Sequence, residues 1–168
     1  MTSTDTQQLS RSLGERLLDR GWMLSCAESC TGGLLAAAIT DIPGSSQWFD
    51  RGLVTYSNAA KRELLGVHAE TLERFGAVSE ETAMEMAAGV LAAASGSDFA
   101  VSTTGIAGPD GGTPGKPVGM VCFGFATRTA QGVVTRAETR VFAGDRQAVR
   151  AAAVNFALST ALQFTPAD

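Results

Sequence analysis

The spacing of hydrophobic residues along the chain alternates between a helical period and short apolar runs. An amphipathic helix that ends at Gly21 is predicted by leucines at every third or fourth position, namely Leu9, Leu13, Leu17 and Leu18. Similar patterns predict further helices over residues 34–39, around 61–65, from 79 to 91 and from 144 to 162. The short runs predict five strands: Trp22–Ala27, Trp48–Tyr56, Phe99–Thr103, Val118–Ala126 and Val133–Phe142.

The order of these elements predicts the fold class. The last two apolar runs flank the turn Thr127–Gly132 and predict an antiparallel hairpin, whereas the earlier strands alternate with helices. This mixture predicts an α/β protein with a mixed sheet and helices on its faces. The chain has 168 residues, 45% of them hydrophobic, and shows no repeat or linker, so we expect a single domain over residues 1–168.

Composition removes several classes of function. The chain has one histidine, His68, which excludes the usual zinc sites that need two or more histidines, so no metal is expected. The formal net charge is −4 and only 18% of residues are charged, which argues against a broad basic face for nucleic acid. A small anionic substrate stays possible where positive charge is concentrated locally.

The sequence also predicts a soluble protein of the cytoplasm. Residues 1–10 are polar and lack the pattern of a signal peptide, and the apolar runs are far shorter than the ~18 residues that cross a bilayer. Cys26, Cys30 and Cys122 form no Cys-x-x-Cys pair, which is typical of reduced thiols. We therefore expect no membrane partner.

Ser29 occupies the turn between a predicted strand and the predicted helix over 34–39. A hydroxyl at such a place lies beside unpaired backbone N–H groups, which can bind a phosphate or stabilise an oxyanion. The simpler interpretation, that Ser29 or Thr31 only caps the helix, stays open on spacing alone. Cys30 is a competing nucleophile, because a helix N-terminus lowers a thiol pKa, but it lacks an imidazole partner. We therefore favour Ser29 as the nucleophile.

A serine nucleophile needs a base, and the chain offers few. His68 stands in the polar stretch Gly66–Glu73 and is expected at the surface. The only lysines are Lys61 and Lys116, and Lys61 is better placed because it follows a predicted buried strand and the single tyrosine, Tyr56. Burial can lower a lysine pKa towards ~7–8, where the amine acts as a base. Tyr56 could relay the proton or be an ordinary core aromatic.

Phosphate contact is not explained by the common motifs. Gly115-Lys116 resembles a P-loop but lacks its first glycine and its Ser/Thr, and no Gly-x-Gly-x-x-Gly occurs. We instead expect phosphate at the helix start Gly144-Asp145-Arg146, which combines backbone N–H groups with a guanidinium. An ordinary surface arginine paired with a carboxylate is the alternative for Arg146.

Seven segments, in this order along the chain, resemble the CinA C-terminal domain family. They are Ala27-Glu28-Ser29-Cys30-Thr31-Gly32-Gly33, Asp41-Ile42-Pro43-Gly44-Ser45-Ser46, Val54-Thr55-Tyr56-Ser57-Asn58 with Lys61, Gly76-Ala77-Val78-Ser79, Thr104-Gly105-Ile106-Ala107-Gly108-Pro109-Asp110-Gly111-Gly112, Lys116-Pro117-Val118-Gly119 and Phe142-Ala143-Gly144-Asp145-Arg146. The resemblance covers about residues 10–164, the expected core of the domain. Longer members of the family carry an additional N-terminal domain, which we do not expect in this chain.

The resemblance implies a three-layer α/β/α fold with a mixed, mostly parallel sheet. Stand-alone members of the family are nicotinamide-nucleotide amidohydrolases, which implies deamidation of nicotinamide mononucleotide to nicotinic acid mononucleotide and ammonia. The family's proposed catalytic serine, tyrosine and lysine fall on Ser29, Tyr56 and Lys61. No cofactor is implied, and a homodimer is expected.

The resemblance also implies how the substrate is bound. The family's threonine falls on Thr104, with Thr103 beside it as the alternative, and its phosphate-side arginine falls on Arg146. Backbone N–H groups of residues 30–33 are expected to stabilise the oxyanion, and the glycine loop to hold the pyridine or ribose. The expected substrate-binding residues are Glu28, Cys30, Thr31, Gly32, Gly33, Thr104, Gly105 and Arg146.

Two other functions stay open on sequence alone. The first is a nucleotide-binding or regulatory module that keeps the pocket without turnover. The second is a serine-lysine hydrolase of another small amide, which would be indifferent to the 5′-phosphate.

Overall fold

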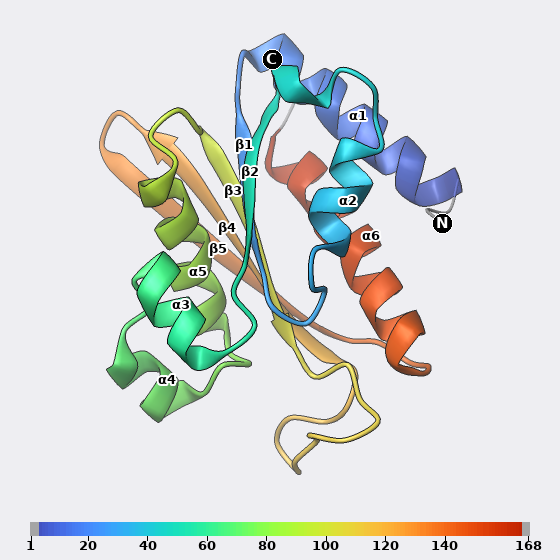
Figure 1. Cartoon of the computed structure of the whole chain (residues 1–168), viewed down its shortest axis with the longest axis vertical. Coiled ribbons are helices and arrows are strands. Elements are labelled where there is room, and N and C mark those ends of the chain that lie inside the picture. Colours follow the sequence, from blue (N-terminus) through green and yellow to red (C-terminus); the bar gives the residue numbers. More distant parts are fainter. Residues whose placement is uncertain (1–3, 166–168) are drawn as a thin grey trace.

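The computed structural model describes residues 4–165 and shows a five-stranded sheet with helices on both faces (Figure 1). The strands are β1 (Leu24–Glu28), β2 (Phe49–Val54), β3 (Phe99–Gly105), β4 (Met120–Thr129) and β5 (Gly132–Val141). The helices are α1 (Thr4–Arg20), α2 (Leu34–Thr40), the short 3-10 helix η1 (Ser45–Gln47), α3 (Asn58–Leu65), α4 (Ala69–Phe75), α5 (Glu80–Ala93) and α6 (Arg146–Phe164). No helix among residues 4–165 is long and apolar enough to span a bilayer.

The strands lie in the order β2-β1-β3-β4-β5. β1 pairs in parallel with both β2 and β3, while β4 pairs antiparallel with β3 and with β5. Four strands therefore run in one direction and β4 opposes them, which confirms the mixed sheet and the hairpin. Because β1, β2 and β3 are parallel, their carboxyl ends meet at one edge of the sheet, where α/β proteins commonly bind ligands.

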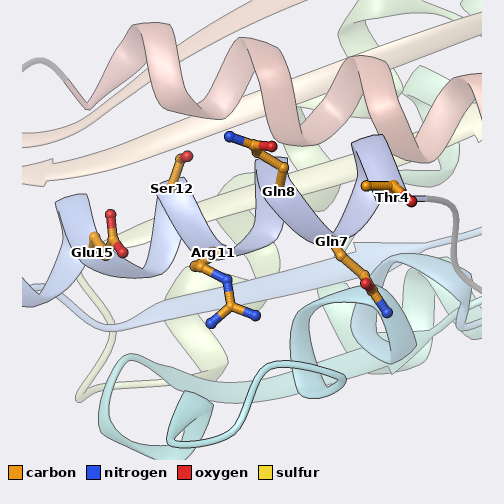
Figure 2. Close-up of a pocket in the computed structure, with 6 residues that line it drawn as sticks. All are labelled: Thr4, Gln7, Gln8, Arg11, Ser12 and Glu15. Carbon is orange, nitrogen blue, oxygen red and sulfur yellow. The ribbon is translucent and has the colours of Figure 1, made fainter.

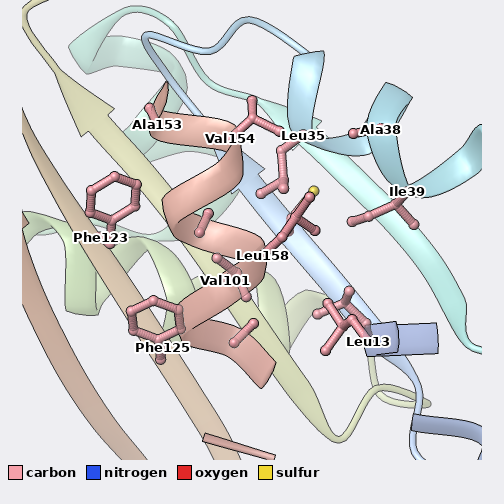
Figure 3. Packing of buried hydrophobic residues seen from close by; sticks show 14 of the residues in the cluster. Leu13, Leu35, Ala38, Ile39, Val101, Phe123, Phe125, Ala153, Val154 and Leu158 are labelled. Atoms are coloured by element: carbon pink, nitrogen blue, oxygen red, sulfur yellow. The ribbon is translucent and has the colours of Figure 1, made fainter. Parts of the chain in front are cut away.

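Two hydrophobic cores fill the space between the sheet and its helices. On one face, α1, α2 and α6 cover a core that contains Leu13, Val101, Phe123, Phe125 and Leu158 (Figure 3). On the other face, α3, α4 and α5 lie over a smaller core built around the apolar stripe of α5 (Figure 1). The three layers, helix, sheet and helix, are those expected.

Two glycines let α5 lie close to its neighbours. A Cβ atom at Gly124 of β4 would stand 2.0 Å from the carbonyl oxygen of Ala83, and one at Gly89 would stand 2.0 Å from that of Leu65 at the end of α3. The backbones therefore touch at both places, because any side chain would force them apart. This tight contact fixes α3 against α5 and, through α5, against the sheet.

The structure differs from the sequence prediction around residues 66–75. Residues 66–73 were expected to be polar and exposed, and no residue of α4 is buried, but the helix itself was not predicted. The helix escapes prediction because it has no apolar stripe. The prediction for His68 is confirmed, since its side chain is 78% exposed and its Nδ1 lies 2.9 Å from Glu85 Oε1.

Candidate active site

Ser29 and Lys61 come from different elements and meet at the carboxyl edge of the parallel strands. Ser29 is the first residue after β1, and its backbone N–H donates to the carbonyl of Thr103 at 3.0 Å. Lys61 lies one turn into α3, which is capped by the hydroxyl of Ser57. The Nζ atom of Lys61 is 2.9 Å from Ser29 Oγ. The structure thus brings the predicted nucleophile and base into direct contact.

The lysine amine is held by three oxygen atoms. Besides Ser29 Oγ, Lys61 Nζ contacts the carbonyl oxygens of Thr55 at 2.9 Å and Tyr56 at 3.0 Å. A neutral amine that donates to the two carbonyls keeps its lone pair for the third direction, where Ser29 stands. The amine can therefore accept the serine proton without moving.

Burial favours the neutral form of the Lys61 amine. The Lys61 side chain is 1% exposed, and among the described residues no carboxylate forms an ion pair with it. Because burial penalises the charged form, the pKa of Lys61 falls from 10.5 to about 8. A base with a pKa in this range can accept a proton near neutral pH.

The structure gives Tyr56 a different position from the one expected. Its side chain is 62% exposed, and its hydroxyl lies 3.4 Å from Arg146 Nη2. Among residues 4–165, no hydrogen bond joins the phenol to Ser29 or Lys61; the backbone carbonyl of Tyr56 contacts them instead, at 3.4 Å from Ser29 Oγ. Among these residues the arrangement supports direct transfer from serine to lysine, and it shows no contact through which the phenol would relay the proton.

Glu28 is also not where a substrate-binding residue would be. Its side chain is fully buried, and its carboxylate accepts hydrogen bonds from the first turn of α2 and from Thr31 Oγ1. A carboxylate is favoured there because a helix N-terminus presents unpaired N–H groups and a positive dipole end. Glu28 thus fixes the turn that carries Ser29 and does not line the cavity.

Two of the four backbone N–H groups that were expected to bind an oxyanion are engaged in other hydrogen bonds. The amide of Gly32 donates to the carbonyl of Ser29 at 3.0 Å, and the amide of Gly33 donates to Glu28. Both are therefore engaged, and the Thr31 side chain is fully buried against Glu28 and Thr103. Within the described part of the chain, the backbone N–H groups of Cys30 and Thr31 donate to no other residue. Of these two residues only Cys30 lines the cavity, whereas Thr31 is fully buried, so the N–H of Cys30 is the better-placed donor for an oxyanion.

Neighbouring threonines on β3 point to opposite sides. Thr103 Oγ1 lies 2.8 Å from Thr31 Oγ1 in the interior, whereas Thr104 lines the cavity next to Ser29 and donates to the carbonyl of Ala77 at 2.8 Å. The choice of Thr104 over Thr103 therefore agrees with the geometry. Gly105 also lines the cavity and belongs to β3 rather than to the loop.

A cavity of about 220 Å³ opens above the serine-lysine pair. It is lined by Ser29, Cys30, Tyr56, Lys61, Ala77, Val78, Thr104, Gly105, Ala107 and Arg146. Burial raises the pKa of the Cys30 thiol to about 11, so the lowering expected from the helix N-terminus is wrong. This favours Ser29 over Cys30 as the nucleophile. Arg146 stands at the mouth, where its Nη1 donates to the carbonyl of Gly108 at 2.8 Å.

Larger hollows elsewhere on the surface lack this chemistry. One of about 400 Å³ runs along the exposed face of α1 and is lined only by Thr4, Gln7, Gln8, Arg11, Ser12 and Glu15 (Figure 2). Another of about 460 Å³ lies between α3 and α4 beside His68. Neither holds a nucleophile in contact with a buried base. Within residues 4–165, no group of three or more histidine, cysteine or carboxylate side chains could hold a metal ion.

One polar residue beside the nucleophile turn was missed in the sequence. Arg150 of α6 donates from Nε to the carbonyl of Cys30 at 3.1 Å and from Nη2 to that of Thr31 at 3.4 Å. It follows Arg146 by four residues, which places both on one face of a helix. This spacing could have indicated from the sequence alone that the two arginines lie side by side on the helix.

Comparisons with known proteins identify the family of this chain. The sequence model of the CinA C-terminal domain matches residues 6–165. Relatives from Enterobacter agglomerans and Escherichia coli strain K12, both named nicotinamide-nucleotide amidohydrolase PncC, are 58% and 53% identical over 97% of this chain and over 97% and 96% of their own. The crystal structure of competence/damage inducible protein CihA from Agrobacterium tumefaciens matches with a TM-score of 0.90 at 45% identity, covering 99% of both chains.

Proposed function

The chain belongs to the CinA C-terminal domain family, and we propose that it hydrolyses the carboxamide of nicotinamide mononucleotide to nicotinic acid mononucleotide and ammonia. The observation that carries the proposal is the 2.9 Å contact between Ser29 Oγ and the buried Lys61 Nζ inside the cavity. The two relatives named as amidohydrolases support the reaction class and the substrate.

The first half of the reaction forms an ester on the enzyme. Ser29 Oγ attacks the carboxamide carbon while its proton passes to Lys61 Nζ, and the carbonyl electron pair moves onto oxygen. The backbone N–H of Cys30, which follows Ser29 and lines the cavity, stabilises this oxyanion. When the carbonyl re-forms, the carbon–nitrogen bond breaks, and Lys61 returns its proton to the leaving nitrogen so that ammonia departs.

The second half hydrolyses the ester. A water molecule attacks the acyl carbon and gives its proton to Lys61, and a second tetrahedral oxyanion forms at the same donor. Its collapse breaks the bond to Ser29 Oγ, which regains a proton from Lys61. The product is the carboxylic acid, and the serine-lysine pair is restored. No residue beyond this pair has to carry a proton in either step.

Arg146 and Tyr56 are suited to the nucleotide part of the substrate. The guanidinium is exposed at the cavity mouth, 3.4 Å from the phenol hydroxyl, and one of its nitrogens is held by Gly108. A guanidinium fixed in this way can bind a 5′-phosphate with its remaining donors. Thr104 and Gly105 also line the cavity and could contact the pyridine ring or the ribose.

Ammonia release from three amides tests the proposed function. We expect the wild-type protein to deamidate nicotinamide mononucleotide much faster than nicotinamide riboside or free nicotinamide, because only the first carries the phosphate. Equal rates on all three would instead identify a hydrolase of other small amides. Binding of the nucleotide without ammonia release would identify a silent binding module.

We also propose that the protein works in the cytoplasm as a homodimer. All three cysteines are free and buried, as in proteins of a reducing compartment. The edge strand β5 exposes Val133, Val134 and Val141, whose side chains are 43%, 51% and 59% exposed and could be covered by a second copy. Sedimentation velocity measures the oligomeric state directly, and a monomer at all concentrations would refute the dimer.

A further inference from the structure

The last strand of the sheet, β5, is a long edge strand. Among residues 4–165 it pairs with β4 alone, at one end of the strand order (Figure 1). The pairing continues from Gly132 to Val141 without a break in register, and this stretch contains no proline. Such an edge presents a row of N–H and C=O groups that can pair with another strand. The outer edge of β5 is therefore a candidate surface for a second chain.

The hydrogen bonds to β4 decide which backbone groups of β5 point outward. Phe142, which follows β5, donates to the carbonyl of Gly119, which precedes β4, at 2.9 Å and in the same register. In an antiparallel pair, successive residues turn their backbone groups alternately toward a neighbouring strand and away from it. Even-numbered residues of β5 therefore bond to β4, and odd-numbered residues point outward. The carbonyl of Thr139 agrees with this, because the exposed Arg140 side chain reaches it at 2.7 Å.

We propose that the outer edge of β5 pairs antiparallel with β5 of a second copy of this chain, about a twofold axis at Ala137. This inference rests on the proposed homodimer and names its surface and its register. The outward-pointing residues then meet directly: Val133 lies opposite Val141 of the partner subunit, and Thr135 lies opposite Thr139 of the partner subunit. The two strands exchange about ten backbone hydrogen bonds, and one sheet continues through both copies.

The side chains of β5 complement one another in this register. Arg136 lies opposite Glu138 of the partner subunit, and the twofold axis makes this pair of opposite charges twice. Val133 and Val141, which are exposed in the single chain, cover each other. A slip of two residues in either direction would instead place Arg136 opposite its own copy or Glu138 opposite its own copy. Like charges directly opposite each other are destabilising, so the charge pattern favours one register.

The helices on the two faces of the sheet agree with the same arrangement. The Arg136 guanidinium lies 4.7 Å from the centre of the Phe164 ring of α6, so the even-numbered side chains of β5 face α6. The hydroxyl of Thr139 donates to Glu80 of α5, so the odd-numbered side chains face α5. Opposite residues in the proposed register are both even or both odd. Each helical layer of one copy therefore continues into the same layer of the other copy.

Engineered cysteines test the register. Under mild oxidation, a mixture of Val133→Cys and Val141→Cys should form a disulfide-linked dimer, because the two positions lie opposite each other. Neither variant alone should be linked, since each position lies about 27 Å from its own copy and a disulfide needs Cα atoms within about 7 Å. The three natural cysteines are buried and should not compete. Efficient linking of one variant alone, or no linking of the mixture, would overturn the register.

Charge reversal tests the surface by sedimentation equilibrium. Arg136→Glu places like charges opposite each other twice and should raise the dissociation constant of the dimer by about tenfold or more. Adding Glu138→Arg to the same chain restores opposite charges and should recover most of the affinity. Arg11→Glu makes the same change of charge on the exposed face of α1 and should leave the dissociation constant unchanged.

The outcomes separate the surface from the other proposals. A dimer whose dissociation constant does not respond to Arg136→Glu would overturn pairing through β5 while the homodimer stands. A monomer at all concentrations would overturn both. Because neither measurement needs a substrate, both results are independent of the proposed amide hydrolysis by Ser29.

Discussion

Lys61 links catalysis and stability through one titration. The ammonium is buried without a carboxylate partner, which lowers the pKa of Lys61 from 10.5 to about 8. Below pH 8 the lysine is charged in both the folded and the unfolded chain, and the folded state bears the full cost of burying that charge. Above pH 10.5 it is neutral in both states and the cost is gone. The lysine therefore destabilises the fold at neutral pH and ceases to do so as the pH rises between these values.

The size of the effect follows from the two pKa values. The change in the pKa of Lys61 from 10.5 to about 8 corresponds to a loss of about 3 kcal/mol in the free energy of unfolding at low pH. Between pH 7 and pH 9.5 the free energy of unfolding of the wild-type protein should rise by about 2 kcal/mol relative to that of Lys61→Met, which keeps the apolar stem but cannot be charged. For a chain of this length, that gain is about 4–8 °C in melting temperature.

Thermal or urea unfolding of the two proteins at a series of pH values measures this difference. Lys116→Met, which removes the other lysine from an exposed loop, is the matched control. In parallel, kcat/KM of the wild type should rise about tenfold from pH 7 to pH 9, because the neutral amine is the working base. A stability difference that stays constant with pH, together with a flat activity profile, would refute the assignment of Lys61 as a buried base.

Three further variants test neighbouring parts of the site. Arg146→Met should raise KM for nicotinamide mononucleotide by about 10- to 100-fold and leave that for the riboside nearly unchanged, since a charge-assisted bond to phosphate is lost; equal effects on both substrates would contradict this. Tyr56→Phe should lower kcat by less than tenfold, because the proton passes directly from Ser29 to Lys61. A loss of about 100-fold or more would instead indicate a proton relay through the phenol. Glu28→Gln should lower the free energy of unfolding by about 2 kcal/mol in denaturant titrations, because an amide cannot accept all the hydrogen bonds of the α2 N-terminus; unchanged stability would argue against its role in the turn.

The pattern of hydrophobic residues was sufficient for most of the fold. The strands and the helices with an apolar stripe were predicted to within a few residues, because burial on one face imposes a regular period. The helix α4 was missed, since a helix that buries none of its residues carries no such signal. The close contacts at Gly89 and Gly124 were also invisible, because a sequence does not show which backbone approaches a glycine.

The candidate site was predictable in its residue types but not in its geometry. Scarcity selected Ser29 and Lys61, because a chain with one histidine and two lysines offers few bases. The direction of each side chain could not be inferred in the same way. Glu28 faces the helix although it directly precedes Ser29, and Tyr56, itself a catalytic candidate, is largely exposed at the edge of the cavity. Arg150 contacts the turn only through folding, since 120 positions separate it from Cys30.

Ammonia release by Ser29→Ala tests the central claim most directly. The wild-type protein and the surface variant Ser12→Ala should deamidate nicotinamide mononucleotide at the same rate, since Ser12 lies on α1 outside the cavity. In Ser29→Ala the rate should fall by about 1000-fold or more, because no other group in the cavity replaces the nucleophile. If purified Ser29→Ala kept most of the wild-type rate, attack by the serine held by Lys61 would be contradicted.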